Sequence, residues 1–120
     1  MLNAFGKNPT KVVTSDEFPN FYCYYYDKDN FSWNDGYFGA CNIYSNRYAF
    51  QGVIKVGDNI SVIDKLGGIK EITKDDNGKN VGYIKWYPTA NDKFDYIDIR
   101  FDYDTTTGTI TSIHVFYNFL

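Results

Sequence analysis

Apolar and polar residues alternate along most of the second half of the chain, which predicts antiparallel strands with two different faces. In residues 81–87, Ile84 and Trp86 share one face of the predicted strand. The opposite face of the same strand carries Tyr83, Lys85 and Tyr87. A strand of this kind buries one face against a core and leaves the other face to solvent or to a partner.

Two further segments show the same alternation. Residues 94–103 and 109–119 each predict a strand, and the Thr-Thr-Thr-Gly stretch at 105–108 predicts the hairpin turn between them. In the first of these strands, four apolar residues oppose three charged ones: Ile97, Ile99, Phe101 and Tyr103 against Asp98, Arg100 and Asp102. The last strand is expected to turn Ile113, Val115 and Tyr117 inward. This half of the chain therefore predicts an antiparallel meander.

A short helix is predicted over residues 56–68, before this meander. Asp58 is a suitable N-cap, and the glycines that follow Leu66 provide a left-handed stop. The apolar positions of one helical face are Ile60, Val62, Ile63 and Leu66. A helix of this length needs a sheet to pack against.

The first half of the chain is similar in pattern to the second. Residues 21–27 correspond to 81–87, and residues 35–46 can be aligned with 107–118. We therefore expect an α+β fold made of two tandem units, 1–52 and 53–120, each an antiparallel meander with a short helix on one face, together forming one compact domain. In this alignment Met1 falls opposite residue 62, so the first helix is truncated. We expect either a natural gene product that extends upstream or a first unit without its helix.

Composition narrows the classes of function. The net charge of −3, with both signs interspersed, argues against a nucleic-acid partner. No apolar run reaches the roughly 18 residues of a membrane span, and no signal peptide is visible at the N-terminus. Aromatic residues make up 20% of the chain, enough both to fill a core and to furnish a recognition face.

The helix and the sheet that follows it resemble a known fold. Gly57, Asp58, Val62, Leu66 and Gly67 approximate the opening motif of the units in the β-lactamase-inhibitor-protein-like (BLIP-like) fold. The resemblance implies that an aromatic sheet face and an acidic hairpin loop grip a partner protein. The residues that it places on the face are Tyr83, Lys85, Tyr87, Tyr96, Arg100, His114, Phe116, Tyr25 and Tyr44, and those of the acidic loop are Asp27 and Asp29. Inhibition of a β-lactamase is not expected.

Catalytic and metal chemistry is sparse in the sequence. His114 is the only histidine, and no neighbouring residue marks an activated nucleophile. Cys23 and Cys41 are expected on opposite faces of the sheet, as free thiols. The acidic stretches 27–35 and 72–80 are explained by turn chemistry, so we expect no metal and no cofactor.

These observations favour a non-catalytic module that binds an unknown protein in an inhibitor, immunity or envelope-associated role. A periplasmic or cell-surface location, with the export signal removed, is favoured over the cytoplasm. Two alternatives stay open: a carbohydrate-binding domain, and a structural domain whose aromatic face is covered in a homodimer.

Overall fold

The computed structural model describes residues 9–15, 20–34, 37–75, 80–88 and 97–117. It contains eight strands and one short helix within these ranges. In chain order the elements are β1 Lys11–Thr14, β2 Phe21–Tyr26, β3 Asp29–Asn34, β4 Tyr37–Ile43, η1 Ile60–Leu66, β5 Ile69–Asp75, β6 Val81–Tyr87, β7 Ile97–Asp104 and β8 Ile110–Tyr117.

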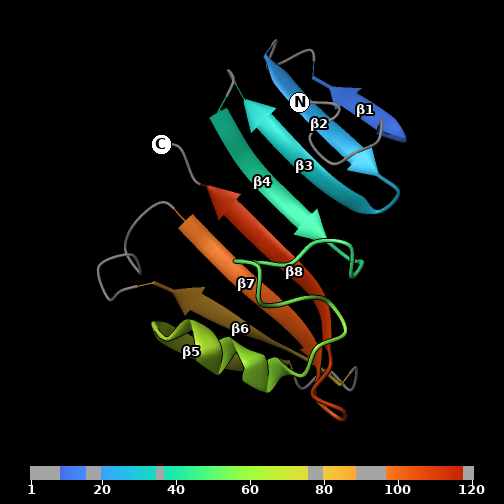
Figure 1. The fold of residues 1–120 in the computed structure, drawn as a ribbon. Coiled ribbons are helices and arrows are strands. Elements are labelled where there is room, and N and C mark those ends of the chain that lie inside the picture. The colour runs from blue at the N-terminus through green and yellow to red at the C-terminus, as the bar shows by residue number, and fades with distance from the viewer. Residues whose placement is uncertain (1–8, 16–19, 35–36, 76–79, 89–96, 118–120) are drawn as a thin grey trace.

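All eight strands form one antiparallel sheet in the order β1-β2-β3-β4-β8-β7-β6-β5 (Figure 1). The meander β1–β4 and the meander β5–β8 join through their last strands, where Asn42 lies opposite His114. The expected α+β class with two tandem helix-plus-sheet units is therefore wrong, and the protein is mostly a single sheet. The reason is that β4 and β8 use each other's free edge for hydrogen bonds, a long-range pairing that strand periodicity does not reveal.

The helix η1 is shorter than predicted and is a 3-10 helix. Its hydrogen bonds run from residue i to residue i−3, as from Val62 N to the Asn59 carbonyl at 3.0 Å. Asn59, rather than Asp58, is the N-cap and accepts a hydrogen bond from Ser61 N at 3.0 Å. Asp58 closes the preceding turn by accepting from Lys55 N at 2.9 Å. The predicted glycine stop is confirmed, since the residues after the helix have positive φ.

The hydrophobic core lies on the face of the sheet covered by η1 and the 44–59 connection, which we call the inner face. In Figure 1 this connection, in green, crosses the β8 and β7 part of the sheet before it reaches the helix. Ile54 of the connection and Ile63 of the helix are fully buried, and they belong to the same cluster as Phe101. Phe50 packs edge-on against Phe101, with ring centroids 5.4 Å apart. Through these contacts the connection and the helix cover the inner face of β6–β8.

The predicted faces of β6, β7 and β8 are confirmed by burial. Ile84, Trp86, Ile99, Phe101, Tyr103, Ile113 and Val115 are all buried in the core. The hairpin at 105–108 is also confirmed: Asp104 accepts hydrogen bonds from Thr106 N and Thr107 N, and Gly108 has a φ of 75°. Strands β1, β3 and β5 were not predicted from the sequence. No helix in the described ranges is long and apolar enough to cross a membrane.

Candidate functional site

The face of the sheet opposite the core, which we call the outer face, is lined by polar and aromatic side chains. One row of directly paired residues crosses all eight strands, from β1 at one edge of the sheet to β5 at the other. Its members are Lys11, Tyr25, Asn30, Asn42, His114, Arg100, Lys85 and Glu71. Directly opposed residues of neighbouring strands project from the same face, so the register brings together side chains that are far apart in the sequence.

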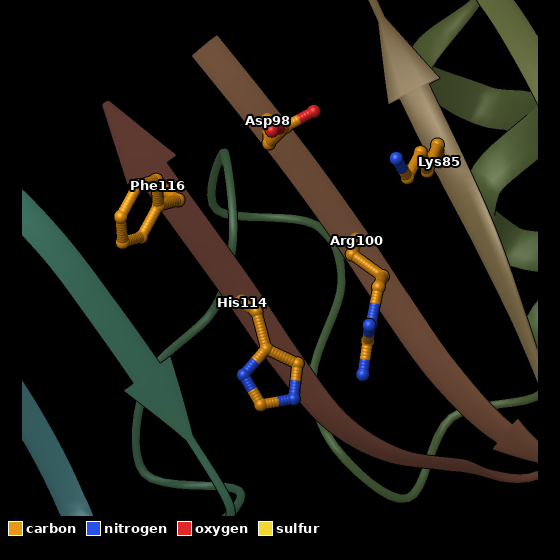
Figure 2. Close-up of a pocket in the computed structure, with 5 residues that line it drawn as sticks. All are labelled: Lys85, Asp98, Arg100, His114 and Phe116. Carbon is orange, nitrogen blue, oxygen red and sulfur yellow. The ribbon is translucent and has the colours of Figure 1, made fainter. Parts of the chain in front are cut away.

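A hollow of about 310 Å³ lies on the outer face over β6, β7 and β8. Its lining residues are Lys85, Asp98, Arg100, His114 and Phe116. Figure 2 shows Lys85 and Phe116 on opposite sides of the hollow, with Asp98 toward one end and the tips of Arg100 and His114 toward the other. Phe116 is 51% exposed, so its ring is accessible to a ligand.

Arg100 is held in one orientation at this hollow. Its Nε and Nη2 atoms donate to the two carboxylate oxygens of Asp102, at 2.7 and 3.0 Å. Its guanidinium lies over the ring of Tyr83, 4.8 Å from the centroid. A bidentate bond and a ring contact together restrict a side chain that is otherwise very flexible. Arg100 therefore loses little conformational entropy when it binds a ligand.

His114 is fixed by hydrogen bonds to two neighbours. The Asn42 amide oxygen can only accept, so His114 Nδ1 carries a hydrogen and donates to Asn42 Oδ1 at 2.6 Å. In the neutral ring, Nε2 is then the acceptor for the Ser112 hydroxyl at 2.9 Å. Asn42 is oriented in turn because its amide nitrogen donates to Asn30 Oδ1 at 2.9 Å. This network rigidifies the outer face across the junction of β4 and β8.

Ser112, His114 and Asp102 lie close together but are not arranged as a catalytic triad. In a triad the carboxylate binds the ring nitrogen that the serine does not use. Here the nearest Asp102 oxygen is 3.5 Å from Nε2, the nitrogen that already contacts Ser112. Ser112 is also buried, with 6% of its surface exposed. The geometry supports a structural network rather than an activated nucleophile.

The pKa of the Asp102 carboxyl group lies below its usual value. Burial acts to raise it, but the hydrogen bonds and charges of His114 and Arg100 together outweigh burial and lower it. Because this pKa is lower in the folded chain than in the unfolded chain, the ionised group stabilises the fold above the unfolded-state pKa of about 3.9. That stabilisation is lost as the pH falls through the folded-state pKa.

We therefore expect the Asp102→Asn variant to be less stable than the native protein at pH 7, with the difference shrinking as the pH falls below about 4. Urea unfolding of both proteins between pH 7 and pH 2.5 measures this difference. The control is Asp98→Asn, which removes a negative charge from the same face of β7 without removing a hydrogen bond from the described residues. A stability difference between the native protein and Asp102→Asn that stayed constant down to pH 2.5 would contradict this assignment.

The two aspartates of the predicted acidic loop have different roles. Asp27 lies in the two-residue turn between β2 and β3 with a φ of 60°, its side chain is 67% exposed, and it pairs with Arg47 at 3.3 Å. Asp29 is the first residue of β3 and is completely buried. It accepts hydrogen bonds from Tyr44 N at 2.6 Å, from Ser45 N at 3.1 Å and from the Ser45 hydroxyl. Asp29 therefore cannot contact a partner, and that part of the prediction is wrong.

The structure brings most of the other predicted face residues together. Tyr83, Lys85, Arg100, His114 and Phe116 surround or line the hollow, and Tyr44 is 44% exposed with its ring edge-on to His114. Tyr25 lies further along the polar row, with Lys11 Nζ 5.5 Å from its ring centroid. Tyr87 is only 5% exposed and offers no contact surface, contrary to expectation. Tyr96 lies outside the described residues.

Four residues of the site were not predicted as site residues. The alternation of residues 97–104 does place Asp98 and Asp102 on the same face as Arg100, so the sequence contained a signal for these two. The alternation of residues 109–119 likewise places Ser112 on the face of His114, whereas Asn42 gave no such signal. The role of Asn42 depends on the pairing of β4 with β8, and that of Ser112 on a hydrogen bond to His114.

The two cysteines are free thiols on opposite faces of the sheet, as expected. Cys41 packs against the inner-face core, and burial raises the pKa of its thiol to about 11. Cys23 lies opposite Ser32 beside Tyr25 on the outer side, and burial also raises its pKa. Neither thiol is activated. Within the described part of the chain, no group of three or more His, Cys, Asp and Glu side chains could hold a metal ion.

Comparisons with known proteins indicate a fold and no family. No family model matches the chain, and no curated protein matches it. A solved structure, that of an extracellular protein containing an SCP domain from Bacillus anthracis strain Ames, is similar, with a TM-score of 0.53 and 7% sequence identity. The likeness covers 91% of this chain and 39% of that one, so the chain spans well under half of its structural neighbour. The resemblance to the BLIP-like fold is overturned by this neighbour and by the single mostly-sheet architecture, and the tandem repeat is not confirmed. At this identity, the chain is similar to part of that extracellular protein in fold alone.

Proposed function

We propose that this chain is a non-catalytic module that binds a partner protein through the outer face of its sheet. The observation that carries the proposal is a hollow that is lined both by a pre-oriented Arg100 and by the exposed ring of Phe116. Arginine and aromatic residues are enriched among the residues that dominate binding energy at protein interfaces. A side chain ordered before binding loses less conformational entropy when the complex forms.

The same geometry supports a protein ligand over a sugar. A carbohydrate site needs an exposed ring face on which the sugar can stack. Phe116 offers one such ring at the hollow, but Tyr83 does not add a second, because the Arg100 guanidinium lies over its ring. Catalysis has equally little support, because the one histidine bonds to a buried serine and an amide.

We propose an extracytoplasmic location, periplasmic or at the cell surface. The support for this location is the extracellular nature of the structural neighbour. Cell fractionation followed by immunoblotting would test it, and recovery only in the cytoplasmic fraction would contradict it.

A comparative pull-down from the source organism's extract tests the binding function. The native chain is compared with a variant carrying Tyr83→Ala, Arg100→Ala and Phe116→Ala together. We expect a protein retained by the native chain to be lost from the variant by at least tenfold, since residues of this kind each contribute about 1 kcal/mol or more at an interface.

The matched control is Ile72→Ala, which truncates a 58% exposed side chain of edge strand β5 outside the hollow and should retain the partner. Circular dichroism of each variant verifies folding, and light scattering tests for self-association. Equal retention by the native chain and the triple variant would sink the proposal. A native dimer that the triple variant converts to a monomer would replace the partner with a second copy of this chain.

A further inference from the structure

The hollow on the outer face contains charged groups that lack partners among the described residues. Lys85 Nζ makes no hydrogen bond or ion pair with any of these residues, and the same is true of the Asp98 carboxylate. Both side chains line the hollow but do not pair with each other. Opposite charges that share a hollow without pairing are available for a ligand placed between them.

Arg100 adds further donors at the end of the hollow away from Asp98 (Figure 2). Two of its N–H groups donate to Asp102, and its guanidinium lies over the ring of Tyr83. These two residues therefore fix its orientation. The guanidinium has more N–H groups than these two bonds use. His114 adds no donor, because its two ring nitrogens are engaged by Asn42 and Ser112. The free donors of the hollow thus come from Lys85 and Arg100.

Asp98 limits which anion can enter. A compact dianion such as phosphate would bring its full charge close to the Asp98 carboxylate and be repelled. A peptide carboxylate carries a single negative charge. The backbone N–H groups beside it can donate hydrogen bonds to the Asp98 carboxylate. The exposed ring of Phe116 borders the same hollow and offers apolar contact to a neighbouring side chain.

We propose that this hollow recognises a carboxylate group of a peptide segment, bound by Lys85 and Arg100, with Asp98 accepting a backbone N–H of the same segment and Phe116 contacting an adjacent apolar side chain. This inference rests on the proposed function and specifies its partner chemistry. The carboxylate belongs either to an acidic side chain or to the C-terminus of the partner.

NMR titration of the full ¹⁵N-labelled chain distinguishes these sources with four probes. N-acetyl-Glu-Phe-amide presents a side-chain carboxylate, and N-acetyl-Gln-Phe with a free C-terminus presents a terminal one. N-acetyl-Gln-Phe-amide is the neutral control, and inorganic phosphate is the competing anion. We expect one or both acidic peptides to shift the amide signals of Lys85, Arg100 and Phe116 with a dissociation constant of order millimolar. The neutral peptide and phosphate should bind at least several times more weakly.

Two variants test the assigned roles. Lys85→Gln keeps most of the side chain but removes its charge. It should lower the affinity for the acidic peptide about three- to fivefold. Asp98→Asn should narrow the preference for the acidic peptide over phosphate. Lys55→Gln removes an exposed lysine charge outside the hollow and should change neither affinity.

Equal shifts with the neutral and acidic peptides, or tighter binding of phosphate, would overturn the carboxylate assignment. This failure is separable from failure of the proposed function. One possible result is that the native chain retains a partner, the triple variant loses it, and no acidic peptide binds. The proposed binding function would then be supported, and the carboxylate assignment would be contradicted. If acidic peptides bind but no partner is retained, the carboxylate site stands without the partner protein.

Discussion

Replacing Asp29 by alanine is expected to lower the free energy of unfolding by about 3 kcal/mol, the cost typical of removing one partner from a buried charged network. Asp29 is 0% exposed and accepts hydrogen bonds from two backbone N–H groups, from the Ser45 hydroxyl and from Arg47 Nη2 at 3.2 Å. These donors all belong to residues 44–47, where the chain leaves β4. Without the carboxylate, the donors would be left unsatisfied and the start of the 44–59 connection would lose its anchor to β3.

Urea unfolding followed by circular dichroism measures this loss. The matched control is Asp27→Asn, two residues earlier, whose exposed ion pair with Arg47 should change stability by no more than about 1 kcal/mol. The prediction would be contradicted if both variants had the same stability. Because Arg47 also donates to the Tyr26 carbonyl at 2.7 Å, an Arg47→Ala variant should be destabilised as well, but less than Asp29→Ala.

Gly68→Ala should be destabilised by about 3 kcal/mol, since it combines backbone strain with a collision. Gly68 has a φ of 70°, and a Cβ atom there would lie 2.5 Å from the Tyr87 carbonyl oxygen and 2.9 Å from Trp86 Nε1. Trp86 Nε1 donates a hydrogen bond to the Gly67 carbonyl at 2.8 Å. A shift of the residue 68 backbone away from β6 would therefore weaken that bond as well. The close approach is needed because the chain passes from η1 directly into β5, which pairs with β6 here.

Gly67→Ala separates the two causes. Gly67 has nearly the same backbone angle, with a φ of 66°, but nothing lies within 4 Å of its added Cβ. Its ψ of −146° places it in a backbone region that is essentially restricted to glycine, so it should lose about 1–2 kcal/mol from strain alone, less than Gly68→Ala. Thermal and urea unfolding of the two variants provide the comparison. Equal losses in both would show that the contact with β6 is not the dominant cause.

Much of the sheet could be predicted from local patterns. The alternation in residues 81–87 and 94–103 identified which side chains enter the core and which form the outer face, because that assignment depends only on the two-residue period of a strand. It failed for Tyr87, whose position on the outer face is correct but whose ring is buried. Asp29 was placed in an accessible loop, because a single acidic residue after a turn gives no sign of the four donors that fold over it.

The candidate site was foreseen in part. Lys85, Arg100, His114 and Phe116 were assigned to one face from strand alternation and from resemblance, and the structure gathers them around one hollow. The network that holds them was not foreseen, since Asn42 and His114 are 72 positions apart and meet only when β4 pairs with β8.

The sequence by itself determined the strands' two faces, the position of the hairpin at 105–108, and the glycine stop after the helix, all of which follow from local periodicity and backbone preference. The tertiary structure alone decided that the two meanders join into one sheet, that η1 is a 3-10 helix capped by Asn59, and that Asp29 is buried. Each of these depends on hydrogen bonds between residues distant in sequence, as when Ile60 N binds the Gly108 carbonyl at 2.7 Å. Such pairings are chosen by the global packing of the chain, because many alternative edges could satisfy the same local pattern.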